Sequence, residues 1–282
     1  MNLFFVSNST CYYFMDELYG LLEEAGYQNV TLGLAYYSGC SVQRHYEWWL
    51  ADMPGYQLRI LDKDGLHVYE GRSMRQSLAY TDWDFISFDN NARSFASGDV
   101  NTSLANAEPY FGMLCKSIRQ QFPLARFLWH EVWANEIGYS MAFQMETKEQ
   151  RTRVYEAKRG VAGIMADTYG LGIVPTGDAW EKVRDLEIFR TPLEGLPVEK
   201  FTLCTRIQSG KIKDDFSHDG DIGGGQYLNA CVWFEVLFQT SCVGNTWRPK
   251  YDLAEEKIPL LQDAAHRAVA EYWGENYTRQ LY

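Results

Sequence analysis

Short apolar runs alternate with longer segments of helical periodicity along this chain, and no other feature limits its possible folds as strongly. Strands that alternate with helices form βαβ units around a parallel sheet. The predicted fold is therefore α/β, a three-layer α/β/α sandwich with a five-stranded parallel sheet. We expect strands at Leu3 to Val6, Val30 to Tyr36, Phe85 to Phe88, Phe127 to His130 and Gly172 to Pro175. We expect helices near 14–25, 73–79, 108–121 and 148–169, and two more after Gly225 and Ala254.

Two segments do not follow this alternation. The stretch from Tyr56 to Tyr69 has Asp64 and Gly65 at its centre, a pair typical of a tight turn. It predicts a β-hairpin, at about 56–70, inserted between the second and third strands as a surface excursion. The stretch from Leu193 to Lys211 has no clear period and predicts a loop or a short extra hairpin.

The length of 282 residues is compatible with one large domain or two small ones. No linker, charge block or internal repeat divides the chain, so we expect a single domain over residues 1–282.

Charge and hydropathy exclude several classes of partner. The formal net charge of −11 disfavours binding to the phosphate backbone of nucleic acids. The sequence has no run of about 20 apolar residues that would span a membrane. Its first residues lack the positive flank and cleavage site of a secretory signal. We expect a soluble, cytoplasmic protein with no membrane partner, and the sequence does not predict its oligomeric state.

The cysteines are scattered without a C-x-x-C pair, so the sequence indicates neither a zinc site nor a redox motif. We expect mostly buried free thiols at Cys11, Cys40, Cys115, Cys204, Cys231 and Cys242. A disulfide between Cys11 and Cys40 is the less favoured alternative, because a cytoplasmic compartment is reducing.

Ligands of open parallel sheets bind beyond the carboxyl ends of the strands. The residues that follow the predicted strands are Ser9, Gly39, Asn90, Asn91, His130 to Trp133 and Thr176. Ser9 and Gly39 offer backbone N–H groups, and Asn90 offers a side-chain amide. Three such donors are what the oxyanion of a tetrahedral intermediate requires.

Ser9 and His218 together suggest a nucleophile and its base. A serine hydroxyl needs an imidazole to accept its proton and a carboxylate to orient that imidazole. Asp215 lies three residues before His218 and is a candidate for the carboxylate. The alternatives are that Ser9 caps a helix, since serine is favoured at that position, and that His218 belongs to a solvated loop.

The chain resembles an SGNH/GDSL-type hydrolase and, more narrowly, the bacterial DUF4886 family of that superfamily. The resemblance covers nearly the whole chain. It rests on five ordered blocks: Val6-Ser7-Asn8-Ser9, Tyr36-Tyr37-Ser38-Gly39-Cys40, Trp83-Asp84-Phe85-Ile86-Ser87, Trp129-His130-Glu131-Val132-Trp133 and Asp215-x-x-His218.

The resemblance implies a flavodoxin-like fold with Ser9 as nucleophile, His218 as general base and Asp215 as its orienting carboxylate. It also implies Gly39 as an oxyanion donor. The third block of the family usually carries Asn, or Gln in the narrower family, so Asn90 is the expected donor there and Asn91 the reserve.

Two residues depart from the family pattern. Ser7 replaces the usual glycine before the Asn, and Thr10 replaces a residue that is often bulky and apolar. A serine would be strained if that position required a positive φ.

Several residues have more than one interpretation. We expect Tyr37, Asn91, His130 and Trp133 to line a substrate pocket, with core packing as the alternative for the aromatic rings. His130 has three interpretations: a core histidine, a substrate contact or an alternative base. A hard-cation site in the loop that contains Asp215, Asp219 and Asp221 is a weaker alternative, since the spacing departs from a calcium loop.

The sequence therefore predicts a serine esterase or acyl hydrolase that needs no metal and no organic cofactor. A small-molecule ester, preferably an acylated carbohydrate, is the expected substrate, because aromatic residues at strand ends suit sugar rings. The rival interpretation is a non-catalytic carbohydrate- or small-ligand-binding protein on a degenerate SGNH scaffold. A metal-dependent hydrolase built on the 215–221 loop is a third.

Overall fold

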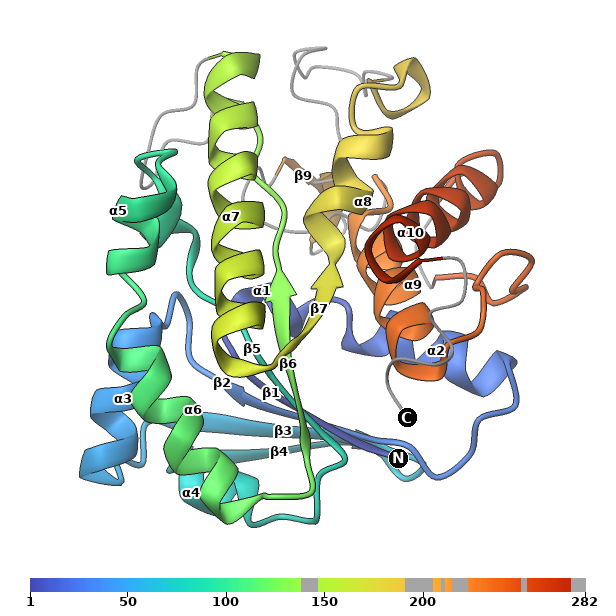
Figure 1. Ribbon diagram of the computed structural model, residues 1–282. Helices are drawn as coiled ribbons and strands as arrows, with labels where there is room; N and C mark the ends of the chain where they lie inside the picture. The colour runs from blue at the N-terminus through green and yellow to red at the C-terminus, as the bar shows by residue number, and fades with distance from the viewer. Residues whose placement is uncertain (138–146, 191–204, 209–210, 215–222, 250–252, 275–282) are drawn as a thin grey trace. The chain divides into compact units, whose positions relative to one another are not determined.

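The computed structural model describes residues 1–137, 147–190, 205–208, 211–214, 223–249 and 253–274. They form an α/β fold with a mostly parallel central sheet and flanking helices (Figure 1). The sheet has seven strands in the order β4-β3-β2-β1-β5-β6-β7. This confirms the fold class that the alternating pattern predicts, with two more strands in the sheet than expected.

All five predicted strands are present, and their bounds lie close to those expected. The strands of the central sheet are β1 (Asn2–Ser7), β2 (Thr31–Tyr36), β3 (Tyr56–Asp62), β4 (Gly65–Arg72), β5 (Phe85–Phe88), β6 (Arg126–Glu131) and β7 (Gly172–Pro175). A separate antiparallel pair consists of β8 (Thr205–Gln208) and β9 (Lys211–Asp214). For the stretch from Leu193 to Lys211, we expected a loop or a short extra hairpin, and this pair is a hairpin that includes the end of that stretch. Residues 193–204 and 209–210 lie outside the described residues.

The predicted helices are also present. They correspond to α2 (Met15–Glu24), α4 (Met74–Leu78), α6 (Tyr110–Gln121), α7 (Lys148–Tyr169), α9 (Gly225–Phe238) and α10 (Ile258–Trp273). The sequence analysis missed α1 (Ser9–Tyr12), α3 (Val42–Ala51), α5 (Val100–Ala105) and α8 (Thr176–Val183), and two 3-10 turns, η1 (Ala92–Phe95) and η2 (Glu187–Arg190). Helix α3 begins at a clear cap, because the Ser41 side chain accepts a hydrogen bond from the Arg44 N–H at 3.2 Å.

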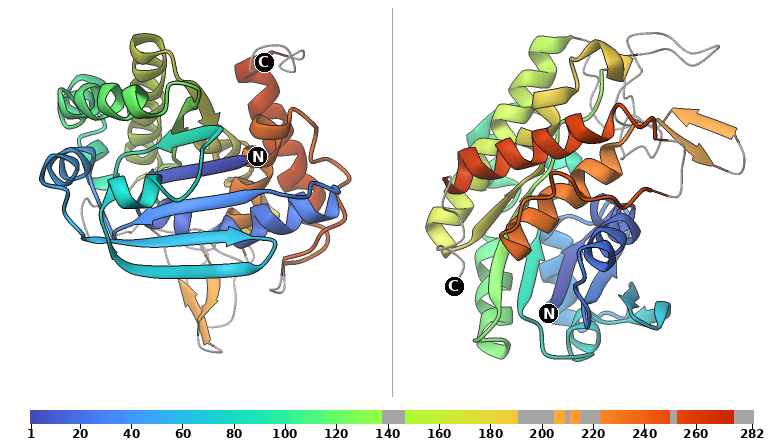
Figure 2. Two further views of the ribbon diagram at one scale, coloured as in Figure 1. Left: turned by 90° about the horizontal axis from the view of Figure 1, so that it is seen from below. Right: turned by 90° about the vertical axis from the view of Figure 1, so that its right-hand side faces the viewer.

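The hairpin is not a surface excursion, and this part of the prediction is wrong. Strand β3 pairs antiparallel with β2, and β4 pairs antiparallel with β3, so both extend the central sheet (Figure 2). Alternate residues of β3 are buried, as in a strand with one covered face. Without the hairpin, β2 would be an edge strand with unpaired N–H and C=O groups.

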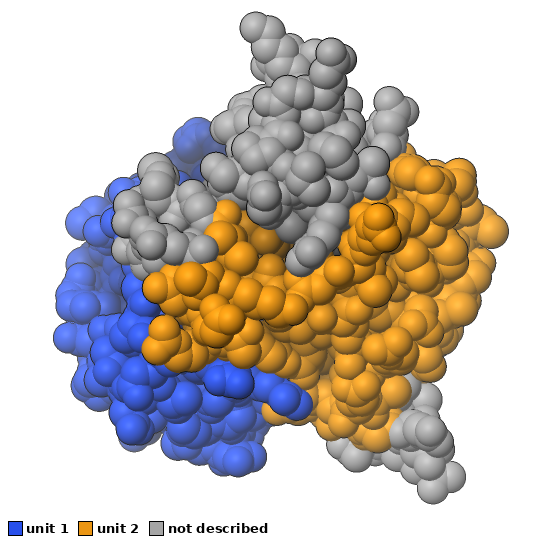
Figure 3. All heavy atoms as spheres, turned by 90° about the horizontal axis from the view of Figure 1, so that it is seen from above, with its two compact units in different colours: residues 1–12, 28–131, 156–173 blue, residues 13–27, 132–155, 174–282 orange. Residues whose placement is uncertain are grey.

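Contacts group the chain into two compact units (Figure 3). Unit 1 contains residues 1–12, 28–131 and 156–173, and unit 2 contains residues 13–27, 132–155 and 174–282. Each unit draws on segments that are distant in the sequence. The single domain stays a prediction.

The core of unit 1 begins with the apolar run of β1. Phe4 and Phe5 point to opposite faces of the sheet, and both are fully buried. Burial of one such side chain stabilises the fold by about 1.5–3 kcal/mol. The Trp83 ring packs against Phe4 with centroids 4.8 Å apart. Gly33 makes room for this ring, because a Cβ at that position would lie 2.5 Å from it.

Helix α6 covers strands β5 and β6 in unit 1 through one aromatic side chain. The Phe111 ring meets Phe88 at 5.3 Å and Trp129 at 5.0 Å between centroids, both edge to face. Phe111 also packs edge to face against Tyr169 of α7, with the ring centroids 5.2 Å apart.

Unit 2 is organised around α9, which is buried on every side from Gly225 to Leu237. Helices α2, α8 and α10 pack against it. The Phe14 ring stacks on Trp233 of α9, and the Trp180 indole N–H donates to Asn229 Oδ1 at 2.8 Å. None of the described helices is both long and apolar enough to cross a bilayer.

Candidate functional site

The carboxyl ends of β1, β2 and β5 lie side by side in unit 1. Both β2 and β5 pair parallel with β1, with Ser7 opposite Tyr36 and Val6 opposite Phe88. The segments that leave these strands therefore begin at one edge of the sheet. Ser9, Gly39 and Asn90 are the predicted site residues on those three segments.

Ser9 is the first residue of the short helix α1 and is half-buried. Asn8 caps this turn, because its Oδ1 accepts a hydrogen bond from the Thr10 N–H at 3.1 Å. Ser9 therefore lies inside the turn that Asn8 caps, and its role as nucleophile stays a prediction.

Asp89, a residue that the sequence analysis did not select, binds the segment around Ser9. It follows β5 directly, and its carboxylate is fully buried. Oδ2 accepts a hydrogen bond from Ser7 Oγ at 2.6 Å and another from the Thr10 hydroxyl. Oδ1 accepts one from Asn8 Nδ2 at 3.2 Å. One carboxylate thus fixes the residues on both sides of Ser9.

The two departures from the family pattern, Ser7 and Thr10, are both donors to this carboxylate. Ser7 ends β1 and has no positive φ, so the backbone strain considered for a serine there does not arise. Sequence reasoning had one signal for Asp89: an acidic residue stands directly after a buried strand at the ligand-binding edge.

Burial raises the pKa of Asp89 to about 6, although the hydrogen bonds from Ser7 and Thr10 and the charge of Lys158 act in the opposite direction. Lys158 lies on α7 and is itself 2% exposed. Removal from water therefore outweighs the favourable partners of the carboxylate. The hydrogen bonds and the Lys158 charge thus offset only part of the cost of burying the Asp89 carboxylate.

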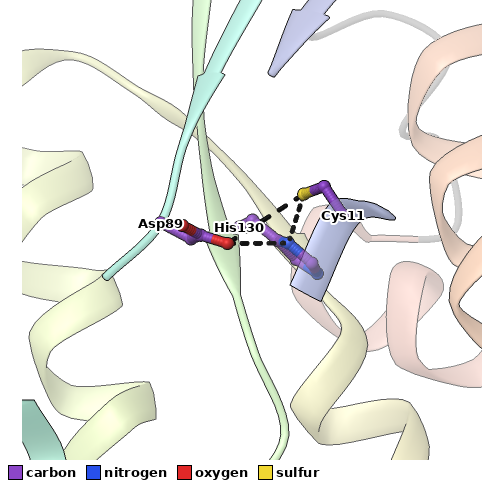
Figure 4. A group of neighbouring side chains, drawn as sticks. All are labelled: Cys11, Asp89 and His130. Atoms are coloured by element: carbon purple, nitrogen blue, oxygen red, sulfur yellow. Dashed lines mark hydrogen bonds and ion pairs between the residues drawn. The ribbon is translucent and has the colours of Figure 1, made fainter. Parts of the chain in front are cut away.

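His130 lies at the end of β6, next to Asp89. Phe88 pairs with Trp129, which places the two residues that follow side by side. His130 Nδ1 lies 3.9 Å from Asp89 Oδ2 and 3.5 Å from the Sγ of Cys11 on α1 (Figure 4). Burial lowers the pKa of His130 to about 3, with a further contribution from Lys158, so the imidazole is neutral. The side chain of His130 is 0% exposed, as in the interpretation of a core histidine, and its role in a substrate pocket stays a prediction.

Asn90 and Asn91 have different environments. Asn90 is 1% exposed, and its Oδ1 accepts the N–H groups of Val42 at 3.2 Å and Asn91 at 3.0 Å. Its buried Nδ2 has no hydrogen-bond partner among the described residues. Asn91 is already engaged: its Oδ1 accepts from the Ser94 N–H, and its Nδ2 donates to the Gly39 carbonyl at 3.2 Å. Gly39 is exposed with φ of 62°, a conformation that favours glycine.

The two predicted aromatic pocket residues differ in exposure. Tyr37 is half-buried after β2, with the Arg44 guanidinium 5.5 Å and the Trp48 ring 4.7 Å from its ring centroid. Trp133 belongs to unit 2, is 2% exposed and stacks on Trp180 at 4.6 Å. Core packing, the alternative for the aromatic rings, describes Trp133 better.

Asp215 and His218 lie outside the described residues, as do Asp219 and Asp221 of the alternative cation loop. Their roles stay predictions. The described cysteines, Cys11, Cys40, Cys115, Cys231 and Cys242, are all buried free thiols, as expected, so Cys11 and Cys40 form no disulfide. Cys204 lies outside the described residues.

No protein-family model matches the sequence, and no curated protein matches it significantly. The crystal structure of a DUF4886 family protein from Bacteroides uniformis does match the structure. The TM-score is 0.75 at 22% sequence identity, over 98% of this chain and 96% of that one. The chain has the DUF4886 fold. The resemblance drawn from the five sequence blocks is confirmed at the level of the fold.

Two further solved structures are more distant from this DUF4886-like chain. A variant of an acetyl-xylooligosaccharide esterase from Geobacillus Stearmophilus has a TM-score of 0.47 at 12% identity, over 89% of this chain and 97% of that one. A GDSL-like lipase from Bacteroides thetaiotaomicron has a TM-score of 0.44 at 10% identity, over 84% and 86%.

Proposed function

We propose that this chain is a serine esterase of the SGNH type that removes an acyl group from a small ester. Ser9 is the nucleophile, His218 is the general base, and Asp215 orients the imidazole. The backbone N–H groups of Ser9 and Gly39 and the side-chain amide of Asn90 bind the oxyanion. No metal or organic cofactor takes part in these steps.

The orientation of the Asn90 amide is the observation that carries the proposal. Two backbone N–H groups, those of Val42 and Asn91, donate to its Oδ1, which leaves Nδ2 as the donor without a partner among the described residues. A buried donor without a partner costs about 1–3 kcal/mol. An oxyanion at this edge would recover that free energy. The same argument supports Asn90 over Asn91, whose amide donates to the Gly39 carbonyl.

The reaction follows the chemistry of a serine triad. Ser9 Oγ bonds to the ester carbonyl carbon while its proton passes to His218. The tetrahedral intermediate collapses as the ester C–O bond breaks, and His218 returns the proton to the leaving alcohol. Water then attacks the acyl group on Ser9 through the same imidazole. The free acid leaves, and Ser9 regains its proton.

An acylated carbohydrate is the substrate class we favour. Tyr37 is half-buried on the segment that also holds Gly39, so part of its ring surface is open to a ligand. Aromatic rings offer apolar faces against which a sugar ring packs. The acidic net charge favours a neutral substrate over an anionic one.

Labelling with a fluorophosphonate, measured by intact mass, tests the proposal. The wild type should gain one adduct, and Ser9→Ala should gain none. Ser38→Ala is the matched control, because Ser38 is an exposed serine on the segment after β2 and should leave labelling unchanged. Hydrolysis of a p-nitrophenyl acetate probe should fall with Ser9→Ala and with His218→Ala.

An inert wild type that still binds acetylated sugars would support the rival, a non-catalytic binding protein. Hydrolysis that persists in Ser9→Ala and disappears with a chelator would instead support the metal-dependent hydrolase. Ser7 no longer favours the rival, because its backbone is not in the strained region.

A further inference from the structure

Three side chains of metal-ligating type converge in the buried interior of unit 1 (Figure 4). Cys11 Sγ lies 3.5 Å from His130 Nδ1 and 4.0 Å from Asp89 Oδ2, and the last two atoms are 3.9 Å apart. We propose that Cys11, Asp89 and His130 hold a zinc ion in a closed structural site. Nothing in the sequence analysis predicted a metal here.

The triangle of ligand atoms has the dimensions of one face of a zinc tetrahedron. Zinc bonds of about 2.0–2.3 Å to nitrogen, oxygen and sulfur place the ligand atoms of a tetrahedral site about 3.5 Å apart. One of the three observed separations has this value, and the other two exceed it by 0.4 and 0.5 Å. Small side-chain rotations close such differences without movement of the strands.

The backbone holds the three ligands in register. Asp89 follows β5, and His130 lies in β6, the strand that pairs with it. Cys11 lies on α1, which follows β1, the other neighbour of β5. Ligands from three adjacent strand ends are preorganised, so the cost of bringing them together is met by the folding of the sheet.

The donor set selects the kind of metal. Calcium and magnesium prefer sites made of oxygen ligands alone. A thiolate, an imidazole and a carboxylate together suit zinc. Thr10 is the candidate for the fourth position, because its hydroxyl contacts Asp89 and has Asn8 Oδ1 as a second acceptor at 3.1 Å. If its proton turns to Asn8, the Thr10 oxygen is available to the metal.

The surroundings match a structural rather than a catalytic zinc site. The side chains of Asp89 and His130 are 0% exposed, and Cys11 is 1% exposed. Structural sites are closed in this way, whereas catalytic sites keep an open position. Ser7 donates to Asp89, as outer-shell groups donate to ligating carboxylates.

Charge supports the same conclusion. The hydrogen bonds that the buried Asp89 carboxylate accepts come from neutral groups, the hydroxyls of Ser7 and Thr10 and the amide of Asn8. When zinc binds, the Cys11 thiol releases one proton to solvent and becomes a thiolate. In this arrangement, His130 binds the metal through Nδ1 and carries its proton on Nε2. The divalent ion is then balanced by one thiolate and one carboxylate.

Metal content and a cobalt spectrum of the wild-type chain test the proposal without any variant. The full chain, produced with added zinc and purified without chelator, should carry one zinc per chain by elemental analysis. After chelation, added Co²⁺ should give a thiolate-to-cobalt charge-transfer band and raise the melting temperature. A zinc-free chain whose cobalt complex lacks that band would overturn the proposal and leave the three side chains as a hydrogen-bonded cluster only.

Substitutions assign the metal to this site. Cys11→Ser and His130→Gln should lower zinc affinity by more than the ~10–100-fold that loss of an outer-shell group costs. Cys115→Ser is the matched control, because Cys115 is a buried free thiol of unit 1 on α6, and it should retain zinc. Equal retention in Cys11→Ser and Cys115→Ser would contradict the assignment. Labelling of Ser9 is measured separately, on protein from which metal has been removed with a chelator. Loss of labelling would therefore contradict the esterase proposal, and loss of metal binding would contradict the zinc proposal.

Discussion

Each of the two units contains a fully buried carboxylate, and the two are compensated in different ways. Asp89 in unit 1 accepts hydrogen bonds from neutral groups: the hydroxyls of Ser7 and Thr10 and the amide of Asn8. Glu136 in unit 2 is 1% exposed and faces two guanidinium groups. Its oxygens lie 3.8 Å from Arg151 Nη1 and 3.6 Å from Arg184 Nη1.

The groups around Asp89 and the groups around Glu136 differ in how well they can adjust to a change of charge on the carboxylate. Hydroxyl groups rotate and can donate or accept, so the surroundings of Asp89 can accommodate a neutral side chain or a bound cation. Arginine stays charged and only donates, so Arg151 and Arg184 require an anion between them. The cluster around Glu136 is therefore suited to holding structure, whereas the cluster around Asp89 can respond to a ligand.

Removal of the charge at Glu136 is expected to have the largest effect. Glu136→Gln removes the anion that two buried guanidinium groups share, and the loss of one partner from a buried ion pair costs about 3–5 kcal/mol. Each arginine keeps another carboxylate, Asp185 at 3.0 Å from Arg151 and Glu181 at 3.3 Å from Arg184. Urea unfolding measures the change. Glu271→Gln is the control: Glu271 pairs with Lys182 at 2.6 Å but is 61% exposed, so its loss should cost under about 1 kcal/mol. Equal costs for the two variants would contradict the importance assigned to the buried charge of Glu136.

The matching change at Asp89 should cost less. In chelator-treated protein, Asp89→Asn keeps the shape of the side chain, and the rotatable hydroxyls of Ser7 and Thr10 re-form hydrogen bonds with the amide. We expect a loss of about 1–2 kcal/mol in urea unfolding. Asp64→Asn, on the exposed hairpin turn, should leave stability unchanged. If Asp89→Asn lowered the free energy of unfolding as much as Glu136→Gln, the neutral donors around Asp89 would accommodate an uncharged side chain no better than the arginines do.

A double-mutant cycle measures the coupling free energy between Ser7 and Asp89. Ser7→Ala removes one donor and should cost about 1 kcal/mol. Combined with Asp89→Asn, its effect should be non-additive by at least ~0.5 kcal/mol, because both residues share one hydrogen bond. Ser77→Ala is the control, since the Ser77 hydroxyl donates to the Ser73 carbonyl at 2.8 Å and should combine additively.

The smallest effect is expected at Asp185, at the more exposed end of the arginine cluster. Although burial opposes them, hydrogen bonds from Lys148 and Arg151 hold the pKa of Asp185 below its ordinary value. A lowered pKa contributes stability that is present above the pKa of the unfolded chain and is lost as the pH falls below it. Asp185→Asn should therefore destabilise the protein by under about 1 kcal/mol at neutral pH, and the difference should begin to shrink as the pH falls below about 4 and continue to shrink towards the lower pKa of the folded state. A difference that persists in acid would indicate that the ion pair is not its cause.

The strands and long helices could be predicted because their patterns are local. The run Leu3–Val6 is apolar at every position, as a strand buried on both faces must be. Helix α7 repeats its apolar positions over many turns, and its predicted bounds are those observed. The hairpin turn at Asp64 was visible too, but the partner of β3 was not, because pairing with β2 depends on residues far away in the sequence.

The candidate site was predictable only in part. Ser9, Gly39 and Asn90 follow strands, so their place at the sheet edge was expected from topology. Asp89 was missed because its importance lies in three hydrogen bonds from a segment about eighty residues away. His130 was selected for a pocket, but its burial beside Cys11 became visible only with the strand register.

The sequence by itself determined the five predicted strands, the six predicted helices and the segments that leave the carboxyl edge of the sheet, because these depend on local periodicity. It also determined the resemblance to the DUF4886 family, which depends on the order of short blocks. Only the tertiary structure decided that the hairpin joins the sheet, that the Asn90 amide points its Nδ2 away from its backbone donors, and that Cys11, Asp89 and His130 meet. These are long-range facts: parallel pairing brings distant residues together, and burial then sets which charges and hydrogen bonds each residue can keep.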